Sequence, residues 1–144
     1  MHEEIPLSLY VHIPWCQKKC PYCDFNSHTI ATKLPEARYV ESLIKDLEWD
    51  KELSQGRKIN TIFFGGGTPS VFSSKSIGRI IAAIDNLIGI SPHAEITIEA
   101  NPGSTDKKKY GDFFSVGINR ISIGAQSFQS KHLESLGRIH SNKD

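Results

Sequence analysis

The sequence has almost no excess of charge of either sign: 17 Lys and Arg residues stand against 16 Asp and Glu residues, for a formal net charge of +1 over 144 positions. This balance does not indicate a nucleic acid or a membrane surface as a partner. Long hydrophobic runs are also missing, because no stretch approaches the roughly 20 apolar residues that span a bilayer. The first ten residues are unlike a signal peptide. We therefore expect a cytoplasmic protein with no integral membrane segment and no nucleic-acid partner.

Cysteine is equally scarce, with three residues in the whole chain, and all three lie between positions 16 and 23. Three cysteines cannot all pair with one another, and a reducing cytoplasm argues against a disulfide framework. The clustering of the three thiols predicts metal or redox chemistry instead.

The cysteines Cys16, Cys20 and Cys23 have the spacing C-x3-C-x2-C, directly after a strand-like run. Thiolates on such loops hold iron–sulfur clusters, and three ligands on a cluster of four irons leave one iron open to a substrate or cofactor. A structural zinc site stays open as an alternative, with His12 or His28 as the fourth ligand that zinc requires. Chance clustering is the remaining interpretation.

Two hydrophobic periods alternate along the chain. Apolar residues at every second position predict strands, and stripes such as Val40, Leu43, Ile44 and Leu47 predict amphipathic helices. The strands are expected at 5–13, 60–64, 94–100 and 118–128. The helices are expected from 35 to near Gly56, from about Ser73, from a Ser104 cap to Gly117, and from 131 to 138.

This alternation predicts an α/β fold of about four β/α units with parallel strands and right-handed crossovers. The strands carry polar residues on one face and branched apolar residues on the other, which favours a partial (β/α) TIM-like barrel, where the polar face lines the lumen. A flat doubly wound sheet is the alternative, but its strands would be apolar on both faces.

Five segments carry a resemblance to a known family: "YVHIPWCQKKCPYCDFNS", "FFGGGTPS", "IEANP", "RISIGAQSF" and "LGRIHS". Their order and spacing resemble the radical S-adenosylmethionine (SAM) superfamily. Within this superfamily, they resemble the branch that contains oxygen-independent coproporphyrinogen III oxidases and HemW-type heme chaperones. The resemblance implies a [4Fe-4S] cluster on the three cysteines, with S-adenosylmethionine bound to the open iron.

The same resemblance implies a set of cofactor contacts. Tyr10 would lie at the sulfonium, and Tyr22 could stack on the adenine. The glycine-rich strand end would contact the methionyl amino group, Glu99 the ribose hydroxyls, and Arg138 the cofactor carboxylate. The full expected set is Tyr10, Tyr22, Gly66, Gly67, Thr68, Glu99, Gln126 and Arg138.

Plainer interpretations of these residues stay open at this point. The glycine run could be only a tight turn or a phosphate cradle, and the two tyrosines could be packing residues. Glu99 could be a solvated residue at a strand end, and Arg138 a surface arginine on a helix. His12 is assigned no role beyond the motif, because a lone histidine is more often a core residue.

Two features distinguish the branches within the resembled group. The oxidases carry a further cysteine two places after the third cluster ligand, where this chain has Phe25, and a sizeable segment before the first strand. Both departures favour a chaperone that binds heme and delivers it to acceptor proteins. Coproporphyrinogen oxidation is the alternative function, although we consider it less favoured, and a zinc-stabilised binding module without cofactor is the third.

Family members have six β/α units and a further C-terminal domain, so residues 1–144 are expected to form the N-terminal part of a radical SAM core domain. Four units alone would leave strand edges open, which promotes pairing with another chain. We therefore expect the isolated chain to self-associate, to bind cofactor weakly and to transfer no measurable heme.

Overall fold

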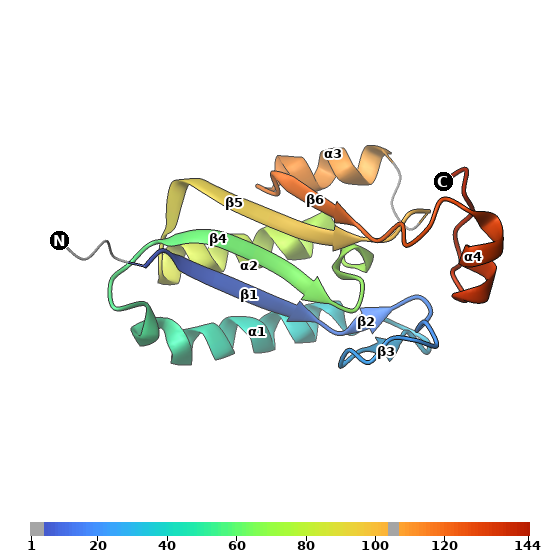
Figure 1. Cartoon of the computed structure of the whole chain (residues 1–144). Helices are drawn as coiled ribbons and strands as arrows, with labels where there is room; N and C mark the ends of the chain where they lie inside the picture. The colour runs from blue at the N-terminus through green and yellow to red at the C-terminus, as the bar shows by residue number, and fades with distance from the viewer. Residues whose placement is uncertain (1–4, 104–106) are drawn as a thin grey trace.

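The computed structural model describes residues 5–103 and 107–144. Its centre is a four-stranded, wholly parallel sheet with the order β1-β4-β5-β6 (Figure 1). The strands are β1 (Leu7–Ile13), β4 (Ile59–Gly66), β5 (Ile90–Ala100) and β6 (Arg120–Ile123). Because all four strands are parallel, they end at the same edge of the sheet. The fold confirms the expected α/β class and is that of part of a TIM-like barrel.

Three helices cover one face of the sheet: α1 (Glu36–Asp50), α2 (Ser74–Leu87) and α3 (Lys107–Ser115) (Figure 1). Their apolar stripes and the alternate apolar residues of the strands form one hydrophobic core. In α2 the buried residues are Ile77, Ile80 and Ile84, as the helical period predicted. The side chain of Ser73 caps this helix by accepting a hydrogen bond from the backbone N–H of Ser76.

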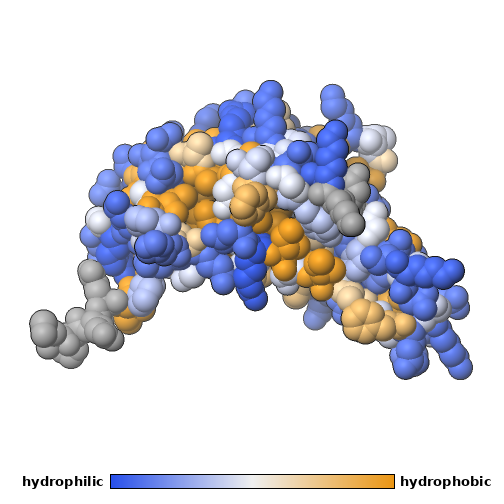
Figure 2. All heavy atoms as spheres, turned by 90° about the horizontal axis from the view of Figure 1, so that it is seen from above, coloured by the Kyte–Doolittle hydropathy of each residue, from blue (hydrophilic) through white to orange (hydrophobic). Residues whose placement is uncertain are grey.

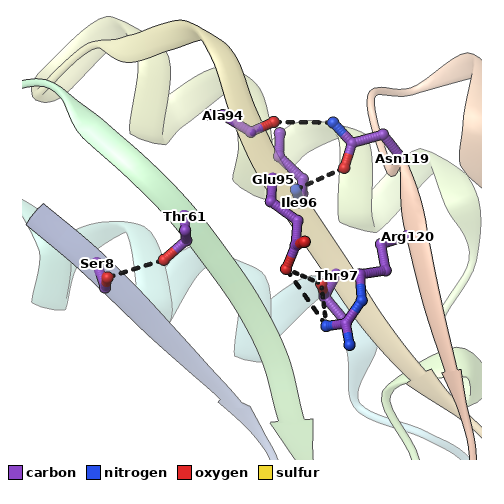
Figure 3. Close-up of polar contacts among 8 residues, drawn as sticks. All are labelled: Ser8, Thr61, Ala94, Glu95, Ile96, Thr97, Asn119 and Arg120. Carbon is purple, nitrogen blue, oxygen red and sulfur yellow. Dashed lines mark hydrogen bonds and ion pairs between the residues drawn. The ribbon is translucent and has the colours of Figure 1, made fainter. Parts of the chain in front are cut away.

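The opposite face of the sheet is polar, as the strand alternation predicted (Figure 3). Thr61 on β4 donates a hydrogen bond of 2.8 Å to Ser8 on β1. Arg120 on β6 forms an ion pair of 3.3 Å with Glu95 on β5. Because the helices cover only the apolar face, this polar face is free to carry the residues of a binding site.

Several boundaries differ from those predicted. The strand expected at 118–128 ends at Ile123, and residues 124–129 form an irregular segment in which Gln126 has a positive φ of 62°. Strand β5 begins at Ile90, four residues before the predicted start at 94. The last helix, α4, spans only Ser130–Ser135. The first helix ends at Asp50 and continues as the 3-10 turn η1 (Lys51–Ser54) before Gly56. The Ser104 cap lies outside the described residues.

The sequence did not predict a second, small ladder. In this ladder, β2 (Trp15–Cys16) pairs with β3 (His28–Thr29), and the pairing closes the cysteine loop at its base. A short 3-10 turn, η2 (Pro69–Val71), follows the glycine-rich end of β4. Both pieces have only a few residues and no alternation long enough to detect in a sequence.

Large hydrophobic residues remain on the surface, and Figure 2 shows a hydrophobic band bordered by hydrophilic residues. Phe128 is 83% exposed, and Phe114 and Ile123 are also largely exposed.

In the described part of the chain, β1 and β6 each pair with one strand of the sheet. None of the described helices combines the length and the apolar character needed to cross a bilayer.

Candidate functional site

A cavity of about 290 Å³ lies at the edge where the four strands end. Its walls come from the cysteine loop after β1, the ends of β4 and β5, the segment after β6, and the segment after α4. Every predicted site residue except Tyr10 lines this cavity. These residues are Cys16, Cys20, Cys23, Tyr22, Gly66, Gly67, Thr68, Glu99, Gln126 and Arg138. Parallel strands bring together segments that are more than 100 positions apart in the sequence.

The cysteine loop is built on the β2–β3 ladder. Cys16 lies within that ladder and is buried, and its carbonyl accepts a 2.9 Å hydrogen bond from the N–H of Ile30. A tight turn brings the N–H of Cys23 to the carbonyl of Cys20 at 3.0 Å. All three thiols are free. Across the described residues, however, no three His, Cys, Asp or Glu side chains are close enough together to coordinate one metal ion.

His12 holds the far side of this loop, a role that the sequence did not predict. Its Nε2 lies 2.9 Å from the carbonyl of Asn26, and since a carbonyl only accepts, this nitrogen carries the proton. Its Nδ1 is then the acceptor for the hydroxyl of Tyr10, at 2.9 Å. The pair therefore connects β1 to the end of the cysteine loop.

Tyr10 lies beside the site and does not line the cavity. It is 57% exposed on the polar face of the sheet and stacks against Phe63. Partial burial and the negative charge of Glu99 raise the pKa of its hydroxyl. The contact between Tyr10 and the cofactor sulfonium stays a prediction, and Tyr10 is close enough to Glu99, which lines the cavity, to feel its charge.

Close packing of protein atoms explains the glycines at the end of β4. A Cβ on Gly67 would lie 2.6 Å from the carbonyl oxygen of Trp15, and one on Gly66 would lie 2.7 Å from the ring of His12. The N–H of Gly67 also donates to the carbonyl of Ile13 at 2.8 Å. We expected glycine here so that a ligand could approach, but at these two positions the space is taken by the strand and loop next to β4.

Glu99 projects from β5 into the cavity on the polar face, as its alternation with Ile98 predicted. Burial raises the pKa of its carboxyl above the ordinary value, and a hydrogen bond from the backbone of Gly66 partly opposes this shift. The carboxylate is therefore less well solvated than a surface glutamate. Hydrogen-bond donors from a ligand would compensate for that lost hydration.

Arg138 is the centre of the hydrogen-bond network around the cavity. One terminal nitrogen, Nη1, lies 3.3 Å from Sγ of Cys20, and the other, Nη2, donates to Oδ1 of Asn101 at 2.8 Å and to the carbonyl of Gly124 at 2.7 Å. Asn101 in turn donates to the hydroxyl of Thr68 at 3.0 Å. Arg138 thus joins the cysteine loop to the segments that follow β4, β5 and β6, so it is not a solvated surface arginine.

Sequence reasoning missed Asn101 as a member of the site, although it lies in the quoted segment "IEANP". Its position directly after β5 was the available signal, because polar residues at the ends of parallel strands gather at one edge. Gln126 falls within the strand predicted at 118–128 and was expected to contact the cofactor. It does line the cavity, but from the irregular segment after β6.

A family model described as the Radical SAM superfamily matches residues 10–144, which is nearly the whole chain. This chain belongs to the radical SAM superfamily. Among curated radical SAM relatives, it is 49% identical to "Heme chaperone HemW" of Escherichia coli and 50% identical to that of Haemophilus influenzae. It is 41% identical to "Radical S-adenosyl methionine domain-containing protein 1, mitochondrial" of Danio rerio.

The superfamily match extends to three-dimensional structure. The solved structure of coproporphyrinogen III oxidase (HemN) from Escherichia coli, described as a radical SAM enzyme, superposes with a TM-score of 0.86 at 29% identity, over 94% of this chain and 31% of that one. The alignments to the two bacterial chaperones cover 94% of this chain and 36% of each relative; the alignment to the Danio rerio protein covers 95% and 31%. The chain therefore spans about a third of the length of these proteins.

The packing at β4 predicts the effect of adding one methyl group. Gly67→Ala should lower the free energy of unfolding by about 1 to 3 kcal/mol, because the new Cβ would overlap the Trp15 backbone, which cannot rotate away. Gly111→Ala in α3 is the matched control, since nothing lies within 4 Å of its Cβ. That control should gain about 1 kcal/mol from helix propensity. Denaturant unfolding measures both, and an unchanged Gly67→Ala would contradict the packing argument.

The raised pKa of Glu99 predicts a pH-dependent cost of ionisation. The folded chain holds this proton more tightly than the unfolded chain, so stability falls as the pH rises from the unfolded pKa through the folded one. Glu99→Gln removes this titration. The variant should therefore gain stability relative to the wild type as the pH rises above about 4, where a free glutamate loses its proton. Thermal midpoints across that range, with Glu41→Gln on the exposed surface of α1 as control, measure the effect; a constant difference would contradict it.

Proposed function

We propose that this chain provides the [4Fe-4S] and S-adenosylmethionine site of a HemW-type heme chaperone, a protein that binds heme and delivers it to acceptor proteins. The observation that carries the proposal is the single cavity that three free cysteines share with Glu99 and Arg138. The high identity to relatives named as heme chaperones supports the same function. The cluster, the cofactor, the heme and the acceptors are all part of this proposal.

The donor set of the cavity fits an iron–sulfur cluster. Three soft thiol ligands on one loop suit iron, and their number leaves one iron open. A bound cluster would supply the electron that cleaves S-adenosylmethionine reductively. The three sulfurs do not gather around one metal ion, and a cluster would not require this, because each thiolate would bind a different iron. The Arg138 contact to Cys20 would keep that thiol at the cavity.

The other walls fit S-adenosylmethionine. Glu99 would accept hydrogen bonds from both ribose hydroxyls, which would compensate for its burial. Gly66, Gly67 and Thr68 form the wall at the end of β4 that would contact the methionyl amino group. Tyr22, at the mouth of the cavity, offers a face on which adenine could stack.

Arg138 has a structural task in addition to the proposed contact with the cofactor carboxylate. Both of its terminal nitrogens already donate to protein atoms. We therefore propose that Arg138 acts first by holding the cavity walls together. Its positive charge would still favour a carboxylate nearby, because charge interactions act beyond direct contact.

Heme transfer is favoured over coproporphyrinogen oxidation by two observations. The identity to the proteins named as heme chaperones is 49% and 50%, against 29% to the oxidase structure. Phe25, which stands where the resembled oxidases have a further cysteine, lines the cavity with an apolar ring. A zinc-stabilised module is less favoured, because neither His12 nor His28 lines the cavity with the cysteines.

The cluster proposal predicts the result of removing one thiol. Anaerobic reconstitution of the wild-type chain should give about four irons per chain and a broad visible absorption that bleaches on reduction. Cys20→Ala should lose both, because two thiolates cannot hold the cluster. His28→Ala is the control, since it would matter only for a zinc site. Full iron in Cys20→Ala, or stoichiometric zinc without iron in the wild type, would contradict the proposal.

The chaperone proposal predicts heme binding without turnover. Heme titrated into the cluster-loaded chain should shift its absorption saturably, while anaerobic incubation with coproporphyrinogen III, S-adenosylmethionine and a reductant should give no product. Cluster loading occupies the thiols and so prevents them from binding heme themselves. Product formation without heme binding would instead establish the oxidase function.

A further inference from the structure

His140 is buried beyond the last helix and outside the cavity wall. Its side chain is 8% exposed, and its Nε2 lies 3.1 Å from the carbonyl oxygen of Ala125. Because a carbonyl only accepts, Nε2 carries a proton and donates. This histidine lies in the segment "LGRIHS" and has no part in the proposed function.

His140 and Arg138 act on neighbouring points of the same segment. Arg138 donates to the carbonyl of Gly124 at 2.7 Å, and His140 donates to the next carbonyl, that of Ala125. The two residues are two positions apart, so both side chains face this segment, while Ile139 between them is exposed. Residues 138–140 therefore clamp two consecutive peptide groups at the point where β6 has ended.

The segment held by these two bonds, residues 124–127, forms a turn with a strained backbone. The N–H of Gly124 still donates to the carbonyl of Ala100 at 2.9 Å, as a strand would, but the chain then turns sharply, and the N–H of Ser127 bonds the carbonyl of Ala125 at 2.7 Å. Gln126, in the middle of this turn, has a φ of 62°. A residue with a side chain rarely adopts this conformation unless the surrounding structure holds it.

The turn determines where Gln126 points. The amide nitrogen of Gln126 would lie 3.3 Å from a Cβ on Gly124, so the side chain folds back over that glycine and reaches the cavity. In a straight continuation of β6, which the sequence suggested, the residue would follow the strand alternation instead. The bond from His140 to Ala125 fixes the peptide directly before Gln126.

We infer that His140 is a positioning residue, which holds the turn after β6 so that Gln126 stays in the cavity. This inference rests on the proposal that the cavity binds S-adenosylmethionine. His140 does not line the cavity, so it would act on the site only through the Ala125 carbonyl and Gln126.

Hydrogen exchange on the ligand-free chain tests the clamp without any cofactor. His140→Phe keeps a buried aromatic ring but removes the donor, so the amides of residues 124–127 should exchange faster than in the wild type. His140→Gln, whose amide nitrogen replaces Nε2, should restore protection. If His140→Phe does not fold, His140→Asn takes its place, because its shorter amide cannot reach the carbonyl. Unchanged exchange in the donor-free variant would overturn the inference.

Binding of S-adenosylmethionine by calorimetry to the reconstituted chain tests the consequence. Loss of one buried hydrogen bond should weaken binding roughly two- to tenfold in His140→Phe, with iron content unchanged and His140→Gln close to wild type. In a Gln126→Ala background, His140→Phe should have no further effect, because the histidine acts through that glutamine. Additive losses, wild-type affinity in His140→Phe, or a loss in His140→Gln equal to that in His140→Phe would each overturn the inference.

The two proposals fail in different ways. If the wild-type reconstituted chain does not bind S-adenosylmethionine, the proposed function is wrong, whatever the exchange data show. If the wild type binds and His140→Phe binds equally well, only the role of His140 is wrong.

Discussion

The guanidinium of Arg138 is the contact on which the candidate site depends. It connects Cys20, Asn101 and Gly124, which belong to three segments that the fold brings to one edge of the sheet. Hydrogen bonds to a charged group are stronger than neutral ones, and these lie partly out of water. The cysteine loop would otherwise be joined to the sheet mainly through β1 and the small β2–β3 ladder. The arginine therefore closes the cavity on the side away from β1.

On the opposite side, close packing of the end of β4 against its neighbours closes the cavity. The glycine-rich end of β4 packs so closely against Trp15 and the His12 ring that no side chain fits at Gly66 or Gly67. His12 then reaches the carbonyl of Asn26 and holds the end of the cysteine loop. His12 thus holds the loop at Asn26 and Arg138 holds it at Cys20, and within the loop Lys19 donates to the carbonyl of Phe25 at 3.1 Å.

Function and stability act in opposite directions at Glu99. Burial raises the pKa of its carboxyl, so the ionised form costs folding free energy in the absence of a ligand. The same burial would make the carboxylate a stronger acceptor for a ribose diol, because fewer water molecules compete for it. The strained turn at Gln126 is a second local cost in folding free energy. The hydrogen bonds from Arg138 and His140 stabilise this turn. Both costs lie at the cavity.

Three features could be predicted without a structure: the parallel β/α order, the polar and apolar faces of the strands, and the position of the cysteines after the first strand. These features follow from local periods of two and 3.6 residues and from the chemistry of thiols, so they can be read without a structure. The inward direction of Glu99 followed from alternation with Ile98 in the same way. The tertiary structure alone decided that β6 stops at Ile123, that Gly67 is needed for packing, and that His12, Asn101 and His140 position the site. Each of these depends on contacts between residues that are 14 or more positions apart, and the register of the sheet, which no local period encodes, sets those contacts.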